Sequence, residues 1–306
     1  MQTTLAKEFS LIGTGLHSGR PVRLKAMPAP AGHGVVFVRS DIMDRDNVVV
    51  ARFDAVNDTQ LCTRIANEAG VEVSTVEHLM AALAGCGVHN VRIEVDGPEV
   101  PIMDGSSVRF VHEILTAGVI GLEAPVRVLQ ILQPVKVVDG LAVAELLPSD
   151  SFEIDFRIEF DDPAIGTQMR RLDMENGSFA RELSDCRTFC RQADVDYMRR
   201  IGLARGGNLE NAVVVDAGRV LNPEGFRRAD ECVRHKMLDA LGDLALAGAP
   251  VLGRYRGIRA GHRMTNLLLR KLFDTPEAFE FIEADAELAA RLPGAGLSIS
   301  DLDMAV

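Results

Sequence analysis

Stretches in which apolar and polar residues alternate recur along the chain and predict β-strands. The clearest is FEIDFRIEF at 152–160, where five apolar residues alternate with four charged ones, as expected for a strand that is buried on one face. VRIEV at 91–95 alternates in the same way. Further strand candidates are VRLKAM (22–27) and GVVFVR (34–39). These stretches predict a chain rich in half-buried strands.

Two hairpins and several helices are predicted between these strands. The expected hairpins are PVKVVDGLAVAELLP (134–148), turning at Asp139-Gly140, and NAVVVDAGRVLN (211–222). The expected helices are STVEHLMAALAGCG (74–87), DVDYMRRIG (194–202), a long segment at 230–247 and a final helix that begins with HRMTNLLLRKLF.

The long helix carries an unusual polar stripe. His235, Asp239 and Asp243 are four residues apart, so in a helix they lie within an arc of roughly 80°. Apolar residues occupy the opposite side and predict a buried face. One interpretation of the stripe is a solvated surface. The other is a metal site, because a His and a carboxylate one turn apart can reach the same ion.

The order of the predicted elements favours an α+β fold, because each half of the chain offers a sheet and helices. GLEAPVRV at 121–128 contains a proline and has no strong periodicity, so we place a domain boundary there. The expected domains are residues 1–122 and 127–306. The chain's 306 residues suit two such domains, each with a sizeable core.

Composition narrows the class of function. The chain is 47% hydrophobic and 25% charged, with a formal net charge of −11, which argues against nucleic-acid binding because that affinity depends on clustered Lys and Arg. The sequence contains no apolar run of about 18 residues and therefore predicts no membrane span. The N-terminus lacks the pattern of a signal peptide. The five cysteines form no CxxC pair. We therefore expect a cytoplasmic protein with reduced thiols.

Two histidines from elsewhere in the chain can complete the polar stripe. His78 with His235 and Asp239 gives three N and O ligands, the usual protein set of a catalytic zinc site. Such a metal would lie between the two domains, where active sites are common. His262 follows Gly261 at a predicted strand-to-helix turn and is a candidate acid. A buried structural histidine is the alternative for His78.

The carboxylates beside these histidines have two interpretations each. Glu77 fits a capping box that begins at Ser74, and it also stands next to His78, where it could accept a proton from an attacking water. Asp243 is either a solvated helix residue or the partner that keeps His262 cationic. Spacing alone leaves both pairs of alternatives open.

Four stretches of the chain carry a family resemblance. They are GTGLHSGRPVRLKAMPAPAGHGVVFVR, STVEHLMAALAGCGVHNVRIEVDGPEVPIMDGSS, VRHKMLDALGDLAL and AGHRMTNLLLRKL. Together they resemble the UDP-3-O-acyl-N-acetylglucosamine deacetylases, the zinc amidases of lipid A biosynthesis in Gram-negative bacteria. The resemblance implies two domains of similar topology, each a sheet layered against helices. It also implies a β-α-β insert in the second domain, at about 193–222, that shapes an apolar passage for a fatty acyl chain.

The resemblance also implies roles for particular residues. The implied metal ligands are His78, His235 and Asp239; the implied catalytic residues are Glu77 as base, His262 as acid, Asp243 as its charge partner and Thr188 as an oxyanion donor. The implied substrate contacts are Lys236 at the phosphates and Leu61 and Cys62 near the acyl chain. Two residues depart from the family pattern, Cys190 in place of a common Gly and Asp162 in place of a common His.

The expected activity is removal of the acetyl group from UDP-3-O-(3-hydroxyacyl)-N-acetylglucosamine by a monomer with one Zn²⁺ per chain, or Fe²⁺ in the cell. The expected partner is the UDP-acyl-sugar, with no nucleic acid and no transmembrane segment. Two alternatives are a non-catalytic, zinc-stabilised binding protein and a zinc amidase with a different substrate. A closed set of four ligands would favour the first.

Overall fold

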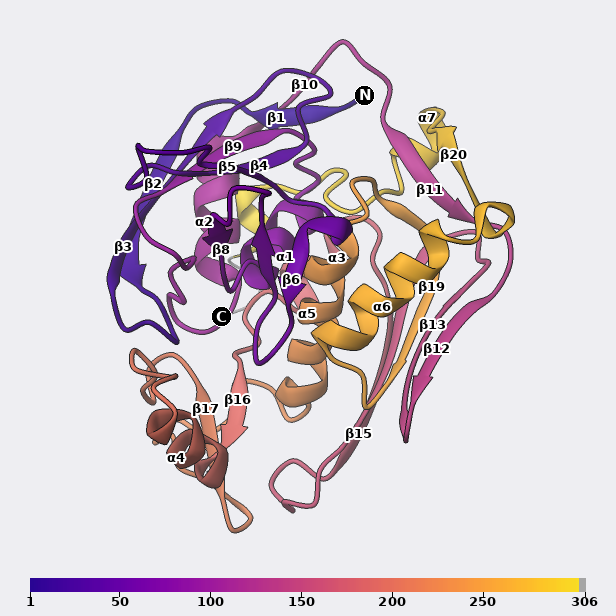
Figure 1. Ribbon diagram of the computed structural model, residues 1–306. Helices are drawn as coiled ribbons and strands as arrows, with labels where there is room; N and C mark the ends of the chain where they lie inside the picture. Colours follow the sequence, from indigo (N-terminus) through magenta and orange to yellow (C-terminus); the bar gives the residue numbers. More distant parts are fainter. Residues whose placement is uncertain (303–306) are drawn as a thin grey trace.

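Two β-sheets enclose a layer of helices in the computed structural model, which describes residues 1–302 (Figure 1). The sheets lie on opposite sides of four helices, α1 (Glu77–Gly85), α2 (Val108–Ala117), α5 (Glu231–Ala245) and α6 (His262–Phe273). One apolar core extends from the first sheet through the helices to the second. The predicted α+β class is confirmed.

The first sheet comes from the N-terminal part of the chain. Its strand order is β2 (Phe9–Thr14), β3 (Pro21–Pro28), β9 (Val91–Val95), β4 (Val35–Arg39) and β5 (Val48–Val50). Neighbours are antiparallel except for β4 and β9, which are parallel. The strands predicted at 22–27, 34–39 and 91–95 are confirmed. Helices α1 (Glu77–Gly85) and α2 (Val108–Ala117) belong to the same part of the chain.

Helix α1 begins three residues later than the predicted 74–87. The N–H of Ser74 donates to the carbonyl of Pro98 (2.9 Å), which ties Ser74 to a neighbouring segment. Thr75 has a φ of 56°, outside the right-handed helical region. The helix therefore starts at Glu77, with Val76 as its N-cap.

The second sheet has seven strands. They are β12 (Val135–Asp139), β13 (Ala142–Leu147), β19 (Val251–Ile258), β11 (Arg127–Ile131) and β20 (Phe279–Glu283) in that order, with β14 (Phe152–Glu159) between β19 and β15 (Thr167–Asp173). The first predicted hairpin is confirmed, although Asp139 pairs with Ala142, so its turn is at Gly140-Leu141. Helices α5 (Glu231–Ala245) and α6 (His262–Phe273) pack on this sheet.

Smaller elements complete the described chain. Strands β1 (Thr3–Leu5) and β10 (Val119–Gly121) form a two-stranded sheet. A three-stranded sheet has the order β6 (Val56–Asp58), β7 (Arg64–Ala66) and β8 (Glu72–Val73). Short helices are α3 (Ser178–Glu182) and α7 (Ala286–Ala289), and 3₁₀ turns cover Phe53–Ala55, Pro276–Ala278 and Ile299–Asp301. The prediction of α6 as the final helix is wrong, because α7 follows it. The domain division at 122–127 stays a prediction.

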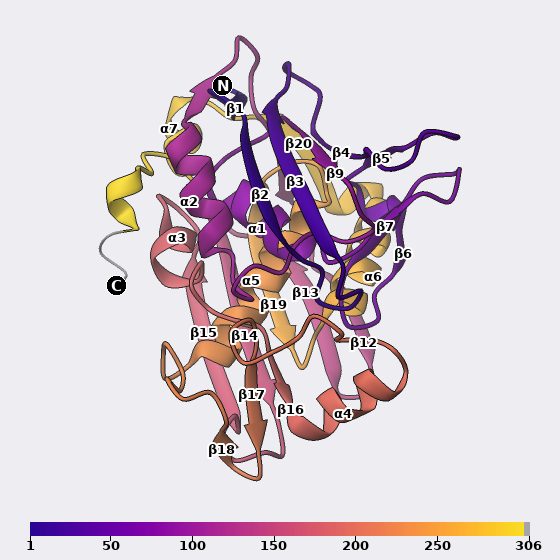
Figure 2. The same cartoon turned by 90° about the vertical axis from the view of Figure 1, so that its left-hand side faces the viewer.

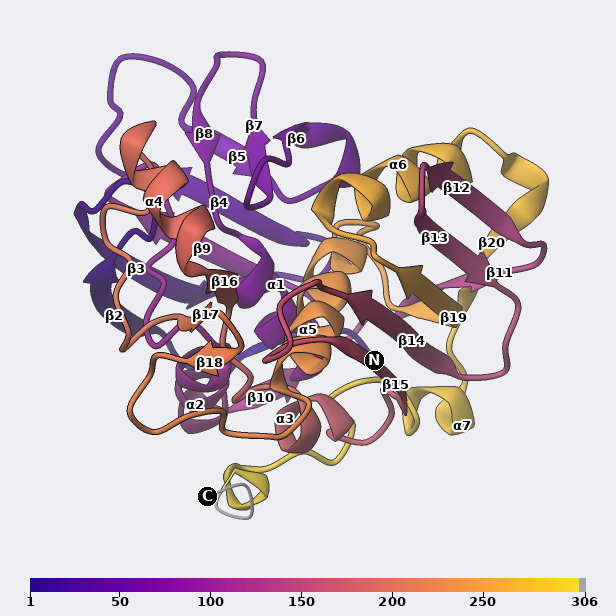
Figure 3. The ribbon, with the colours of Figure 1, turned by 90° about the horizontal axis from the view of Figure 1, so that it is seen from below.

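A β-α-β unit lies at one end of the helix layer (Figures 2 and 3). Strands β16 (Phe189–Arg191) and β17 (Val213–Asp216) are parallel and are joined through α4 (Gln192–Arg200). Strand β18 (Arg219–Val220) pairs with β17 and forms the second predicted hairpin. The unit begins at Phe189, four residues before the insert that the resemblance implies at about 193–222.

Helices α1 and α5 pack against each other at close range. A Cβ atom added to Gly242 of α5 would lie 2.0 Å from the carbonyl oxygen of Glu77 in α1, so a glycine is required at this crossing. The polar stripe of α5 faces this contact region, and His235, Asp239 and Asp243 are only 2–5% exposed. The interpretation of the stripe as a solvated surface is therefore wrong.

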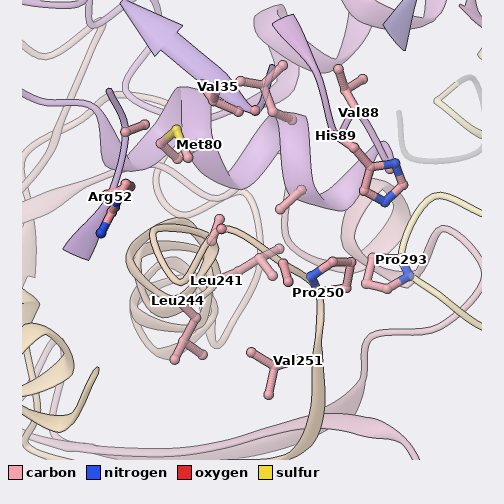
Figure 4. Close-up of a pocket in the computed structure, with 18 of the residues that line it drawn as sticks. Val35, Arg52, Met80, Val88, His89, Leu241, Leu244, Pro250, Val251 and Pro293 are labelled. Carbon is pink, nitrogen blue, oxygen red and sulfur yellow. The ribbon is translucent and has the colours of Figure 1, made fainter. Parts of the chain in front are cut away.

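The apolar side of the same helix pair borders a separate cavity of about 340 Å³ (Figure 4). Met80 of α1 and Leu241 and Leu244 of α5 form its walls together with Val35 and Val251. Its lining shares no residue with the polar pocket described below. Among residues 1–302, each helix is too short or too polar to span a lipid bilayer.

Candidate metal centre and active site

Three predicted metal ligands meet at the contact between α1 and α5. One ligand atom from each of His78, His235 and Asp239 lies within 4.8 Å of the other two. The Oδ1 atom of Asp239 is 3.3 Å from Nε2 of His235 and 3.6 Å from Nε2 of His78. Two turns of α5 and the first turn of α1 therefore supply the three side chains.

This cluster fits a metal ion. Oδ1 of Asp239 is buried and has no hydrogen-bond partner among the described residues, an arrangement that is costly unless a cation occupies the site. The ring of His235 is oriented by its Nδ1, which lies 3.0 Å from the carbonyl oxygen of Cys186, so Nε2 is directed to the other ligands. Two imidazoles and one carboxylate are the ligands of a catalytic zinc site, which keeps a fourth position open.

Electrostatics keeps the ligands in the forms that bind metals. Burial lowers the pKa of His235 to about 4, so its imidazole is neutral near pH 7. Burial opposes the charged form of Asp239, but His235 and Lys236 outweigh it and hold the pKa of the carboxyl well below its usual range. The ammonium of Lys236 donates to Oδ2 of Asp239 at 2.7 Å.

Glu77 faces the same site and is not a helix cap. Its Oε2 accepts the N–H of Thr63 at 3.0 Å, and its Oε1 is 3.8 Å from Nε2 of His262. The capping-box alternative is wrong, because Glu77 is the first residue of α1 and the Ser74 N–H is bonded to Pro98. Burial raises the pKa of the Glu77 carboxyl above its ordinary value, which makes it a stronger base.

His262 and Asp243 form a buried pair. Nδ1 of His262 is 2.9 Å from Oδ2 of Asp243, and the other carboxylate oxygen accepts the Thr63 hydroxyl at 2.6 Å. Burial disfavours the imidazolium, but the carboxylates of Asp243 and Glu77 outweigh burial and raise the pKa of His262 to about 9. His262 opens α6 after Gly261, at the predicted strand-to-helix turn.

A pocket of about 610 Å³ connects His235, Asp239 and His262 to the β-α-β unit, whereas Glu77, His78 and Asp243 are not part of its lining. His235, Lys236, Asp239 and His262 line its polar end together with Thr188. The other walls are mainly apolar and include Leu61, Phe189, Val195, Met198, Leu209, Val214 and Leu221. The pocket therefore combines a metal-binding cluster with an apolar extension.

The remaining predicted residues divide into two groups. Leu61 and Cys190 line the pocket, whereas Cys62 is buried and does not. Asp162 also lies outside the lining; its carboxylate accepts the N–H groups of Ala164 (2.9 Å) and Gly218 (3.3 Å) and so joins two turns.

Sequence reasoning missed two residues of the site. Thr63 bonds to both Glu77 and Asp243, and no local pattern marks it. His17 lines the pocket, and neither of its ring nitrogens has a hydrogen-bond partner in the described chain. The carboxylate of Glu99 holds the turn of His17 by accepting the N–H groups of His17 and Ser18. A histidine in the turn GTGLHSG was the only available signal.

Comparisons with known proteins show the family to which the chain belongs. Residues 2–274 match the family model described as "LpxC: UDP-3-O-acyl N-acetylglycosamine deacetylase". A UDP-3-O-acyl-N-acetylglucosamine deacetylase of Phenylobacterium zucineum is 50% identical over 278 residues, 91% of this chain and 95% of the relative. The Myxococcus xanthus protein of the same name is 48% identical over 301 residues, which cover 98% of this chain and 94% of that one. The enzyme of this name from Anaeromyxobacter sp. is 47% identical, with 95% of both chains covered. The chain belongs to the family of UDP-3-O-acyl-N-acetylglucosamine deacetylases.

Proposed function

We propose that the pocket between α1, α5 and the β-α-β unit removes the acetyl group from UDP-3-O-(3-hydroxyacyl)-N-acetylglucosamine, the zinc-dependent reaction of this family in lipid A biosynthesis. The products are acetate and the free-amine sugar nucleotide. One observation carries the proposal. The buried cluster of His78, His235 and Asp239 lies beside both a carboxylate and an imidazole, at the polar end of an apolar pocket.

The metal would be held by Nε2 of His78, Nε2 of His235 and Oδ1 of Asp239. A Zn²⁺ ion bound there supplies a Lewis acid that polarises the acetamide carbonyl and lowers the pKa of water. The carbonyl oxygen of Cys186 keeps His235 in the tautomer that leaves Nε2 free to coordinate.

Glu77 and His262 would move the protons. Glu77 accepts the proton of the attacking water, while the N–H of Thr63 holds its other oxygen in place. His262, kept cationic by Asp243, donates its Nε2 proton to the departing amine nitrogen. The two groups begin in opposite protonation states, as an acid–base pair requires.

Thr188 and Lys236 would contact the substrate. The Thr188 hydroxyl stabilises the developing oxyanion from the pocket wall. The Lys236 ammonium, which the resemblance assigns to the phosphates, lies against Asp239, so we propose that it also orients that ligand. Leu61 and the apolar walls beside it receive the acyl chain.

The structural-zinc alternative has less support. The metal-binding cluster found among residues 1–302 contains three protein ligands rather than four, the arrangement that leaves one position for substrate or water. The apolar extension of the pocket favours an acylated substrate over that of an unrelated amidase.

We propose further that the protein acts as a monomer in the cytoplasm. The five cysteines are free thiols, the form expected in a reducing compartment. Sedimentation equilibrium of the purified protein tests the monomer, and a stable dimer at micromolar concentration would contradict it.

An assay of acetate release tests the proposed function. The purified protein is incubated with the UDP-acyl-sugar after treatment with a chelator, and then again after addition of Zn²⁺. We expect activity to disappear and return. Full activity of the metal-free protein, or no release under any metal condition, would contradict the proposal.

A further inference from the structure

The metal ligand His235 is held by a segment that is itself anchored to the same helix. The carbonyl oxygen of Cys186 lies 3.0 Å from Nδ1 of His235. The next residue, Arg187, turns its side chain away from the pocket toward Glu231, in the first turn of α5. Glu231 precedes His235 by four residues, so both lie on one face of the helix.

Arg187 and Glu231 form an ion pair with almost no solvent access. The side chains of Arg187 and Glu231 are 1% and 0% exposed. Oε1 of Glu231 accepts both the backbone N–H and the Nε–H of Arg187, each at 2.9 Å. Its Oε2 accepts the backbone N–H of Arg227 at 2.7 Å. One carboxylate therefore fixes the backbone and the side chain of Arg187 together.

These contacts close a ring of bonds. The ring runs from Glu231 to Arg187, through the peptide bond to Cys186, from its carbonyl to His235, and back along one turn of α5. Within this ring the imidazole cannot rotate without breaking the bond to Cys186. The orientation of Nε2 toward Asp239, 3.3 Å away, thus depends on a pair whose two residues do not line the pocket.

The same pair also positions the oxyanion donor. Thr188 follows Arg187 directly, and its backbone N–H donates to the carbonyl of Gly105 at 2.8 Å. Phe189 then starts β16 and places its ring against that of His235, with centroids 6.2 Å apart. In this segment, Cys186 supplies the carbonyl that orients His235, Arg187 forms the ion pair with Glu231, and Thr188 carries the candidate catalytic hydroxyl.

A contribution to the stability of the fold does not explain why two charged residues are buried together. A buried Arg–Glu pair adds little stability relative to apolar side chains of similar volume, because two charges must be desolvated. It does fix the direction of several hydrogen bonds at once. We propose that Arg187 and Glu231 are positioning residues that set the affinity of the His78–His235–Asp239 site for Zn²⁺ and hold Thr188 at the pocket; this inference rests on the proposed function.

Metal affinity is the direct test. Glu231→Gln preserves size but removes the charge, and Arg187→Lys preserves the charge but removes the two-point bond. We expect the Zn²⁺ dissociation constant of each, measured by competition with a chromophoric chelator, to rise about 10–100-fold, as for partners of metal-bound histidines. The visible absorption of the Co²⁺-loaded protein should also change, because it reports the ligand geometry directly. The rate constant kcat should fall more than KM rises.

A matched control separates positioning from stability. Glu153 is another buried carboxylate that bonds to arginines, Arg171 and Arg254 on the second sheet, and it does not line the pocket. Glu153→Gln should lower thermal stability but leave the Zn²⁺ affinity and the Co²⁺ spectrum unchanged. If Glu231→Gln does not fold, the double variant Arg187→Met/Glu231→Leu, which leaves no unpaired buried charge, takes its place.

Each outcome decides the inference. Weaker Zn²⁺ binding and an altered Co²⁺ spectrum in a folded variant support it, even if the substrate assay fails, in which case only the proposed function falls. Parental Zn²⁺ affinity in the folded Glu231→Gln or double variant overturns it. A loss of affinity that Glu153→Gln shows to the same extent also overturns it.

Discussion

Replacing Glu77 by Gln should abolish most of the activity while leaving the fold and the metal intact. The amide oxygen of Gln can accept the Thr63 N–H, which lies 3.0 Å from the carboxylate in the structure. The lost attraction to His262 across 3.8 Å is worth about 4 kcal/mol at an effective dielectric constant near 20. Because Glu77 is buried, the variant also avoids the cost of desolvating a charge. A desolvation cost of several kcal/mol per buried ion offsets an attraction of this size, so we expect the free energy of unfolding to change by only about 1 kcal/mol.

The catalytic effect of the same change should be much larger. A general base typically contributes 10²–10⁴-fold to the rate, which corresponds to about 2.7–5.4 kcal/mol in the activation barrier. The assay compares kcat of Glu77→Gln with that of the parent and of Glu153→Gln. Urea unfolding and zinc content, which should stay near one ion per chain, are measured on the same samples. A rate close to that of the parent would refute the reasoning and place the base elsewhere.

Three further predictions concern the metal, the acyl chain and the acid. His235→Ala should lose zinc and activity yet unfold cooperatively near the parental temperature, because the apolar side of α5 is packed without the ion; a circular dichroism melt that shows an unfolded chain would instead indicate structural zinc. UDP-N-acetylglucosamine without the acyl group should have a kcat/KM lower by several orders of magnitude, since each buried CH₂ contributes about 0.8 kcal/mol, and equal turnover of both compounds would contradict the acyl passage. Asp243→Asn should move the alkaline limb of the pH–rate profile to lower pH, because the carboxylate that raises the pKa of His262 is gone; an unmoved limb would show that another group sets it.

Local periodicity was sufficient to place three side chains of α5 on one face, although it did not decide between a solvated surface and a metal site. The four-residue spacing placed His235, Asp239 and Asp243 on one face of a helix, and the structure brings them together there. The hairpins and the strand at 152–159 were predictable for the same reason, because alternation and turn residues act over a few positions. The family resemblance added the partners from other segments, which spacing could not select.

What the sequence could not show depends on distant contacts. Glu77 fitted a capping box as well as a general base, and the bond of the Ser74 N–H to Pro98 and the positive φ of Thr75 rule out the capping box. The bond between the Thr63 hydroxyl and Asp243 joins residues 180 positions apart. The anchoring of Cys186 through Arg187 and the unpartnered ring of His17 likewise depend on tertiary packing.

The crossing of α1 and α5 connects the hydrophobic core to the chemistry. Because Gly242 has no side chain, the backbone of α1 can approach α5 at the carbonyl of Glu77. That approach brings Glu77 and His78, at the start of α1, over the stripe that holds Asp239 and Asp243. The apolar faces of both helices pack in one core and fix the crossing. The positions of the proposed acid, base and metal ligands are therefore determined by the same packing that stabilises the fold, and a side chain at position 242 would separate them.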